Sequence, residues 1–291
     1  MTLAHQHIVR VSVADVWKTP RANDRQRLTQ ALLGDPILLE EEDGNWAKVR
    51  LADSYRGYIK RSHLVPVSNS CSGPWGTVIV PAVPIWPQRK SCNGPVTAYL
   101  GTQLRLADNN DGQHKSGYCT VDLPAIGKGL VEEDAIMVTK HSFTLPVKAK
   151  RAQGLAFTLL GTPYMWGGIT CEGIDCSGLI QTAYRGVGLL CPRDVDQQYS
   201  HSRSRAGKPQ PGDLVFFATG QEGVASHVGL YIGSGQFLHA SNRLGGVVVT
   251  SLNSPFYRKC LLGWHHWGIT GCSPRSAAGF DQPEDEINNT D

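Results

Sequence analysis

Apolar and polar residues alternate along residues 8–66 with the two-residue period of β-strands. Within this segment, Asp43-Gly44-Asn45 is a turn signal. The expected strands lie near residues 9–13, 36–40, 46–50, 57–59 and 63–65. Five short strands in one segment predict a small β-barrel, which we place at residues 1–68.

A second all-β unit follows residues 67–74, whose Ser, Gly and Pro content is typical of a linker. Its strand candidates are the apolar segments at 77–80, 104–106 and 118–121. A turn is expected at Asn109-Asn110-Asp111-Gly112-Gln113. We therefore predict a second, more divergent barrel at residues 74–142.

The hydrophobic period changes to that of α-helices from residue 148 onward. A first helix ends at Gly161 and Pro163, and a second is expected over 176–187. Strands are expected after the helices, at 213–219, 227–232, 236–240, 246–252 and 261–267. Helices followed by antiparallel strands predict an α+β domain at residues 148–272.

Composition and charge exclude some classes of function. Hydrophobic residues make up 41% of the 291 residues and charged residues 18%, as in a globular protein with a sizeable core. The net charge of +3 gives no reason to expect nucleic acid or a membrane surface as a partner. No apolar stretch approaches the roughly 18 residues that a membrane span needs. We expect a monomer.

The two ends of the chain bear on its location. The first ten residues lack a basic start followed by an apolar core, so no secretory signal is recognised. A cytoplasmic protein is the simple expectation, but a periplasmic or extracellular protein trimmed of its signal would look the same. Residues 273–291 are polar and acidic, and we expect them to form a disordered tail.

The eight cysteines contain no Cys-x-x-Cys pair, so a zinc ribbon is not expected, and no metal or organic cofactor is implied. Their even number is compatible with disulfides after export and with reduced thiols in a cytosol. Seven are interpreted as structural: Cys71, Cys92, Cys119, Cys171, Cys191, Cys260 and Cys272.

Cys176 differs from the other cysteines because it opens the predicted helix 176–187. Unpaired N–H groups and the dipole at a helix N-terminus stabilise a thiolate. Ser177 and Gly178 are small, so the backbone here can approach a substrate closely, and an N–H near Cys176 could stabilise an oxyanion. These features predict a cysteine nucleophile.

A cysteine nucleophile needs a histidine base on another element. His227 begins one predicted strand, His239 lies in the next, and Gly233-Ser234-Gly235 between them is a hairpin turn. Antiparallel pairing would bring the two histidines together, with His227 as the base and His239 holding its ring in the useful tautomer. His265-His266 lies in a strand flanked by tryptophans and is interpreted as packing.

Residues 150–267 resemble the NlpC-type, papain-like cell-wall endopeptidases. The matching segments are 161–168, 175–179 (Asp175-Cys176-Ser177-Gly178-Leu179), 192–194, 211–217, 227–233 and 239–240, in the family's order. The resemblance implies a papain-like fold with Cys176 as the nucleophile, His227 as the base and His239 as the orienting third residue. It also implies that Tyr164 lies beside the thiol, where its hydroxyl could support the oxyanion.

The first barrel resembles bacterial SH3-like domains through residues 32–35, 44–49 and 55–59. Two such barrels before the peptidase domain resemble the layout of γ-D-glutamyl-L-diamino acid endopeptidases. In that subgroup the first barrel caps the cleft and restricts it to stem peptides with a free N-terminal L-Ala. The resemblance thus implies peptidoglycan stem peptides as partners, cut between γ-D-Glu and diaminopimelate or Lys in murein turnover or recycling.

A free ammonium entering a closed pocket needs acidic partners. Asp175 and Asp194 lie beside the most specific motifs and are the candidates for this contact, to which Ser177 could add a hydrogen bond. By analogy of position Tyr55 of the first barrel would close the pocket, and Tyr58 is an equally open alternative.

These residues also have structural interpretations. Asp175 and Asp194 could simply cap the elements that follow them. Trp166 is interpreted as packing that shapes the cleft, and Asp213 as a turn residue. Val195 stands where many relatives have Ser after Arg-Asp, which removes one polar contact from the expected amine site.

Two other classes of function remain open. The same papain-like core can serve an amidase or acyltransferase, which acylation of Cys176 without peptide cleavage would favour. The chain could also be a non-catalytic wall-binding protein, which peptidoglycan binding without any need for the thiol would favour.

Overall fold

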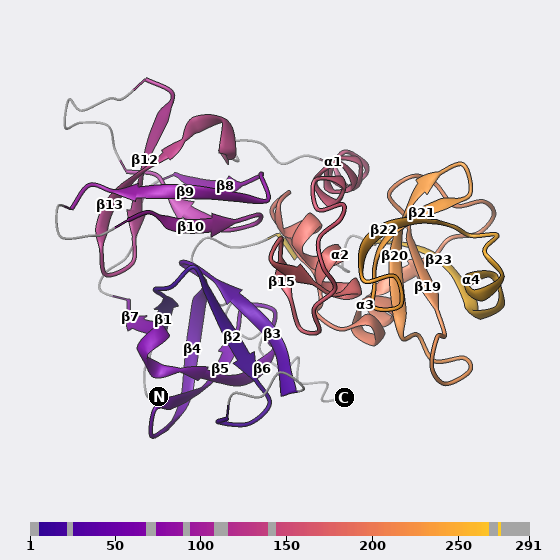
Figure 1. Cartoon of the computed structure of the whole chain (residues 1–291), viewed down its shortest axis with the longest axis horizontal. Helices are drawn as coiled ribbons and strands as arrows, with labels where there is room; N and C mark the ends of the chain where they lie inside the picture. The colour runs from indigo at the N-terminus through magenta and orange to yellow at the C-terminus, as the bar shows by residue number, and fades with distance from the viewer. Residues whose placement is uncertain are drawn as a thin grey trace, which may run out of the picture.

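The computed structural model describes residues 6–21, 26–67, 74–89, 94–107, 116–138, 144–267 and 273–274. Two all-β units, indigo and magenta in Figure 1, lie against a third part that combines helices with a sheet. Among the described residues, no helix has the length and apolar character needed to cross a membrane.

The first unit contains seven strands and a 3₁₀ turn: β1 (Gln6–Val9), β2 (Val13–Trp17), β3 (Arg27–Leu32), β4 (Pro36–Asp43), β5 (Trp46–Leu51), β6 (Arg56–Lys60), η2 (Arg61–His63) and β7 (Leu64–Pro66). The strands form one sheet in the order β3-β2-β6-β5-β4-β1-β7. The all-β prediction is confirmed, and the expected barrel takes the form of an open ladder with β3 and β7 at its ends.

Strand β3 was missed by the sequence analysis, and its contacts explain why. Its last four residues are buried although Thr29 and Gln30 are polar. Both side chains are partnered across a domain interface: Thr29 Oγ1 accepts from Arg193, and Gln30 Oε1 accepts from the N–H of Ile169. Burial on both faces removes the apolar–polar alternation from which strands are predicted.

The second unit consists of β8 (Trp75–Val78), β9 (Ala82–Pro87), β10 (Val96–Tyr99), β11 (Gln103–Arg105), β12 (Tyr118–Leu123), β13 (Gly127–Glu132), η3 (Glu133–Ala135) and β14 (Ile136–Val138). Its strands form two sheets, β10-β9-β13-β12 and β11-β8-β14, which share one apolar core. The turn predicted at 109–113 lies outside the described residues, as does most of the predicted linker at 67–74.

The third part contains the helices α1 (Leu145–Phe157), α2 (Cys176–Arg185), α3 (Val195–His201) and α4 (Pro255–Cys260). Its six-stranded sheet has the order β18-β23-β19-β20-β21-β22, formed by β18 (Ser202–Ser204), β19 (Leu214–Phe217), β20 (His227–Gly233), β21 (Gln236–Ser241), β22 (Gly246–Ser251) and β23 (Leu261–Trp267). Two short pairs are β15 (Ile169–Thr170) with β16 (Gly173–Ile174) and β17 (Leu189–Leu190) with β24 (Ser273–Pro274). The α+β prediction is confirmed, while α3 and α4 were not predicted because both are too short for a helical period.

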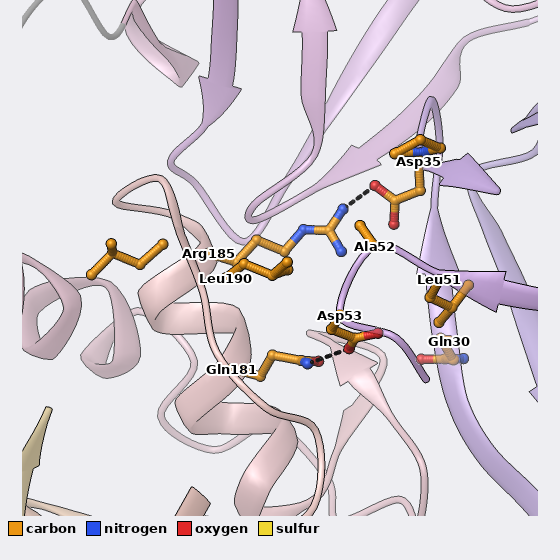
Figure 2. A pocket seen from close by; sticks show the side chains of 10 residues that line it. Gln30, Asp35, Leu51, Ala52, Asp53, Gln181, Arg185 and Leu190 are labelled. Atoms are coloured by element: carbon orange, nitrogen blue, oxygen red, sulfur yellow. Dashed lines mark hydrogen bonds and ion pairs between the residues drawn. The ribbon is translucent and has the colours of Figure 1, made fainter. Parts of the chain in front are cut away.

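Helix α2 lies at the centre of the molecule. All its residues are buried, and it contacts α1, β20 and β21. Figure 2 shows Gln181 and Arg185, one helical turn apart, pointing from α2 toward the β units. Gln181 donates to Asp53 of the first unit (2.9 Å), and Arg185 pairs with Asp35 there and donates to the carbonyl of Gly101 in the second unit (2.9 Å). The same helix therefore fixes all three parts.

The C-terminal segment and the cysteines refine two predictions. The expected disordered tail begins with β24, which pairs with β17, while residues 275–291 lie outside the described part. Cys191 is disulfide-bonded. Four cysteines are free thiols: Cys119, Cys171, Cys176 and Cys260. The remaining three lie outside the described residues: Cys71, Cys92 and Cys272.

Candidate active site

Cys176 is the first residue of α2, as predicted, and is buried. Burial, and after it the charge of Asp175, raises the pKa of the Cys176 thiol to about 12, although the N–H groups of Val228 and Ser177 act in the opposite direction. Desolvation therefore outweighs the helix N-terminus at this position. The resting group is a neutral thiol, which needs a base to become a nucleophile.

Asp175 is the N-cap of α2. Its Oδ1 accepts from the N–H of Gly178 (2.7 Å), and its Oδ2 accepts from the N–H of Gly167 (2.8 Å). Arg193 binds both oxygens through Nη1 (3.0 Å) and Nη2 (2.6 Å). The Ser177 hydroxyl donates to Oδ1 as well (3.4 Å). The interpretation of Asp175 as a cap is confirmed, and its carboxylate accepts from five protein donors.

Arg193 is a site residue that the sequence analysis missed. It is 2% exposed, its Nη1 donates to Ser177 Oγ (2.9 Å), and its Nε donates to Thr29 Oγ1 of the first unit (2.8 Å). Burial alone would lower the pKa of Arg193, but the charge and hydrogen bonds of Asp175 raise it overall. A single buried cation thus holds the residues on both sides of Cys176 and ties them to β3.

His227 and His239 are brought together by the predicted hairpin. In the β20–β21 ladder Leu230 pairs with Leu238, so His227 and His239 lie diagonally on one face. His227 Nε2 lies 2.7 Å from His239 Nδ1. Gly229 lies between them, where a Cβ would be 2.6 Å from the Phe237 ring and 3.1 Å from His239 Cβ. Only glycine leaves room for this pair.

Apolar rings surround the two histidines. The ring of His239 lies 4.5 Å from that of Phe237 and 5.0 Å from that of Tyr257, measured between centroids. Burial lowers the pKa of His227 to about 4. Burial, and after it the charge of His227, lowers the pKa of His239 to about 3. Both rings are therefore neutral near pH 7, as a proton acceptor must be.

The nucleophile and the histidines come from elements that pack directly together. Helix α2 contacts β20, and the thiol of Cys176 lies beside the N–H of Val228, which follows His227. Tyr164 packs against the same apolar core as Cys176. Burial, and after it the charge of Cys176, raises the pKa of the Tyr164 hydroxyl. The four predicted residues therefore lie in one region of the domain, and their catalytic roles stay predictions.

Tyr55 and Asp194 meet across the interface between the first unit and α3. The Tyr55 hydroxyl donates to Asp194 Oδ2 (2.8 Å), whereas Tyr58 lies within β6 opposite Lys48. Tyr55 and Asp194 line a cavity of about 480 Å³. Its other lining residues are Leu28, Asp53, Ser54, Arg56, Pro192, Gln197 and His201. The structure thus places Tyr55 rather than Tyr58 at Asp194.

Asp53 is a second carboxylate at this cavity, and the sequence analysis missed it. It accepts from the N–H of Tyr55 (3.1 Å) and from Gln181 (2.9 Å). Burial raises the pKa of Asp53, and burial likewise raises the pKa of Asp194 against the opposing effects of Tyr55 and Arg193. The only sequence signal for Asp53 was its position in a polar turn, and many other residues of the chain lie in such turns.

The remaining predictions have mixed outcomes. Trp166 is 64% exposed, so its interpretation as a packing residue is wrong. His265 packs on Tyr199 (4.6 Å between ring centroids), which confirms packing there. Asp213 accepts from the N–H of Gln210 (2.7 Å), which confirms a turn role.

Comparisons with known proteins agree with this geometry. Residues 161–266 match the NlpC/P60 family, and residues 19–64 match the bacterial dipeptidyl-peptidase Sh3 domain. A γ-D-glutamyl-L-lysine dipeptidyl-peptidase of Bacillus cereus is 27% identical over 270 residues, covering 84% of this chain and 79% of its own. One of Bacillus subtilis is 28% identical over 256 residues, covering 79% and 78%.

A solved structure extends the comparison to the whole fold. The crystal structure of an NlpC/P60 family protein from Bacillus cereus matches 90% of this chain and 99% of its own, with a TM-score of 0.80 at 23% identity. Fold and site together define a papain-like cysteine peptidase. More particularly, the chain carries an NlpC/P60 domain preceded by a bacterial SH3 domain.

Proposed function

We propose that this protein hydrolyses the bond between γ-D-Glu and the L-diamino acid of peptidoglycan stem peptides that begin with a free L-Ala. The observation that carries the proposal is the convergence of Cys176, His227 and His239 in an NlpC/P60 domain whose neighbouring SH3 domain reaches Asp194 through Tyr55. Relatives that match most of the chain bear the name γ-D-glutamyl-L-lysine dipeptidyl-peptidase.

His227 and Cys176 would perform the acylation step. The contact with His239 engages Nε2 of His227, so Nδ1 is the nitrogen for proton exchange with the thiol. As this nitrogen takes the thiol proton, Sγ of Cys176 attacks the γ-carbonyl carbon of D-Glu. Backbone N–H groups near Cys176 and the Tyr164 hydroxyl would stabilise the oxyanion, in a site where low polarity strengthens each hydrogen bond.

The second half of the reaction uses the same base in reverse. His227 returns its proton to the amine of the diamino acid, which leaves as the tetrahedral intermediate collapses to a thioester on Cys176. A water molecule then gives a proton to His227 and attacks the thioester carbonyl. Release of L-Ala-γ-D-Glu restores the neutral thiol and the neutral imidazole.

Substrate selection would lie at Asp194. The oxygens of Asp175 accept from five protein donors, so the ammonium of L-Ala is better matched by Asp194, with Tyr55 orienting the carboxylate. Desolvation disfavours the charge on Asp194, and an ammonium ion would restore it. Ser177 is oriented by Arg193, and its hydrogen bond to substrate remains a prediction.

A direct assay tests the reaction. Purified protein would be incubated with L-Ala-γ-D-Glu-diaminopimelate and with its Lys counterpart, and the release of L-Ala-γ-D-Glu followed by mass spectrometry. We expect cleavage by the wild type and none by Cys176→Ala. Cys171→Ala is the matched control, because Cys171 is a free, half-buried thiol of the same domain. Turnover by Cys176→Ala would overturn the mechanism.

The same peptides test the selection of a free amine. Acetylation of L-Ala removes the charge that Asp194 would bind, and we expect it to abolish cleavage. Undiminished cleavage of the acetylated peptide would contradict this selection and point to intact wall as the substrate. A thioester on Cys176 without peptide cleavage would instead identify an acyltransferase.

The compartment in which the protein acts remains a prediction. We propose the cytoplasm, with the periplasm or the extracellular space as the alternative, and the disulfide at Cys191 is of a kind that persists in oxidising compartments. Cell fractionation, with determination of the native N-terminus, distinguishes the two locations.

A further inference from the structure

The far side of His239 carries a contact that the proposed reaction does not explain. His239 Nε2 lies 2.9 Å from Thr250 Oγ1 on β22. We propose that Thr250 is a positioning residue for the catalytic base: its hydroxyl holds the proton of His239 on Nε2 and thereby keeps Nδ1 of His227 free. This inference rests on the proposed function of Cys176 and His227.

The backbone brings Thr250 to this place. In the β21–β22 ladder His239 pairs with Val248 and Phe237 pairs with Thr250, so Thr250 lies diagonally from His239 on the same face. His239 in turn lies diagonally from His227 in the β20–β21 ladder. Three neighbouring strands therefore each contribute one side chain to a single line of hydrogen bonds, with separations of 2.7 and 2.9 Å.

The positions of the protons follow from the role of the base. If Nδ1 of His227 is to accept the thiol proton, the proton of the neutral ring is on Nε2, which donates to His239 Nδ1. His239 Nδ1 is then an acceptor, so the proton of this second neutral ring is on its Nε2. That N–H points to Thr250 Oγ1, which must accept it. The productive arrangement thus requires an acceptor at residue 250.

The same arrangement serves both halves of the reaction. When His227 takes up the thiol proton, its Nε2–H continues to donate to His239, so no ring turns and no tautomer changes. The positive charge on His227 polarises His239, and the acceptor at Thr250 stabilises the polarised ring. Loss of the acceptor would also let His239 carry its proton on Nδ1, which forces the proton of His227 onto the nitrogen that faces the thiol.

The surroundings of His239 leave few other partners. Its side chain is 0% exposed, and Phe237 and Tyr257 pack against the ring. Burial lowers the pKa of His239, which agrees with a ring that stays neutral while it orients the ring of His227. Thr250 itself is half-buried at the rim of the sheet. A substitution of Thr250 therefore changes this line of hydrogen bonds without opening the core.

The test compares Thr250→Val with Thr250→Ser. Valine keeps the shape and β-branching of threonine but removes the hydroxyl, whereas serine keeps the hydroxyl. With the L-Ala-γ-D-Glu-diamino acid peptides, we expect Thr250→Val to lower kcat about tenfold with little change in KM, a part of the roughly 10²–10⁴-fold effect of a general base. Thr250→Ser should retain most of the activity.

The pH profile provides a readout that a structural role would not move. Without the acceptor the charged form of His227 is less stable, so the acid limb of kcat against pH should shift to lower pH in Thr250→Val and not in Thr250→Ser. An unchanged kcat and pH profile in Thr250→Val would overturn the proposal. So would an equal loss in the valine and serine variants.

A spectroscopic measurement separates this inference from the proposed function. In protein with ¹⁵N-labelled histidine, the ring nitrogen shifts report the tautomer of His239 and His227 without any substrate. We expect the Nε2–H form of both rings in the wild type and in Thr250→Ser, and a change in Thr250→Val. A wild type that cleaves no stem peptide refutes the proposed function, while these shifts still decide the role of Thr250. Wild-type rings protonated on Nδ1 would overturn it.

Discussion

The two sides of the candidate active site are held by different interactions. On the cysteine side, the buried ion pair of Asp175 and Arg193 fixes the start of α2 and extends to Thr29 of the first unit. On the histidine side, two neutral rings are held by hydrogen bonds and aromatic packing within one sheet. The position of the nucleophile thus depends on a contact between domains, whereas the position of the base depends on one domain.

This difference indicates a division of roles. The SH3 unit reaches the nucleophile through Arg193 and the expected amine site through Tyr55, so cleft geometry and substrate selection share one interface. The histidines lie in one sheet of the third part, and the rings of Phe237 and Tyr257 pack against His239. Substitutions on the cysteine side should therefore affect stability, domain contact and activity together, whereas those on the histidine side should affect stability and activity and leave the domain contact unchanged.

The largest effect is expected from Arg193→Met. It leaves the carboxylate of Asp175 buried without its cation, which typically costs about 3–5 kcal/mol in stability. Denaturant titration measures this loss, and activity should disappear with it. The double variant with Asp175→Asn is the control, because it removes the unpaired charge and should recover part of the stability. Equal stability of Arg193→Met and wild type would contradict the described network.

Acid pH should weaken the histidine side. The pKa of His227 is about 4 in the folded protein against about 6.5 in a free chain, so the folded state disfavours the charged ring. The stability that comes from this neutral ring is complete above pH 6.5 and is lost as pH falls toward 4, by about 3 kcal/mol. Denaturant midpoints between pH 7 and 4 measure this slope. His227→Gln should show a shallower dependence of stability on pH. An unchanged dependence in this variant would contradict the assignment of the effect to His227.

A smaller effect is expected from Gly229→Ala. The added methyl group meets the Phe237 ring and His239 Cβ, and such overpacking costs about 1–3 kcal/mol. The displaced His239 should lower kcat more than it raises KM, which steady-state kinetics with the stem peptide would measure. Gly154→Ala is the control, because nothing lies within 4 Å of a Cβ there. Full activity of Gly229→Ala would show that the base tolerates movement.

The smallest effect is expected from Tyr55→Phe. It removes one hydrogen bond to Asp194, worth about 1 kcal/mol or roughly fivefold in kcat/KM, and the change should lie in KM. Tyr58→Phe is the matched control, because Tyr58 lies opposite Lys48 in the sheet and should have little effect. An equal rise in KM for both variants would argue against the role of Tyr55.

Much of the fold and part of the site could be predicted from local patterns. The helix that begins at Cys176 and the hairpin that joins His227 to His239 each occupy a short segment with a clear period and clear turn signals. The prediction failed where burial came from another domain. Strand β3 has polar residues with interdomain partners, and Arg193 looks like an ordinary charged residue in the sequence although it is 2% exposed.

The sequence by itself determined the α+β class, the order of the units and the residues that supply the thiol and the two imidazoles, because short-range spacing encodes helix starts and strand pairs. Only the tertiary structure decided that burial keeps the thiol neutral and that Asp175 forms an ion pair with Arg193. It alone also placed Tyr55, Asp53 and Thr250 at the site. Desolvation and contacts between distant segments arise only when the three units pack together, so no local pattern carries them.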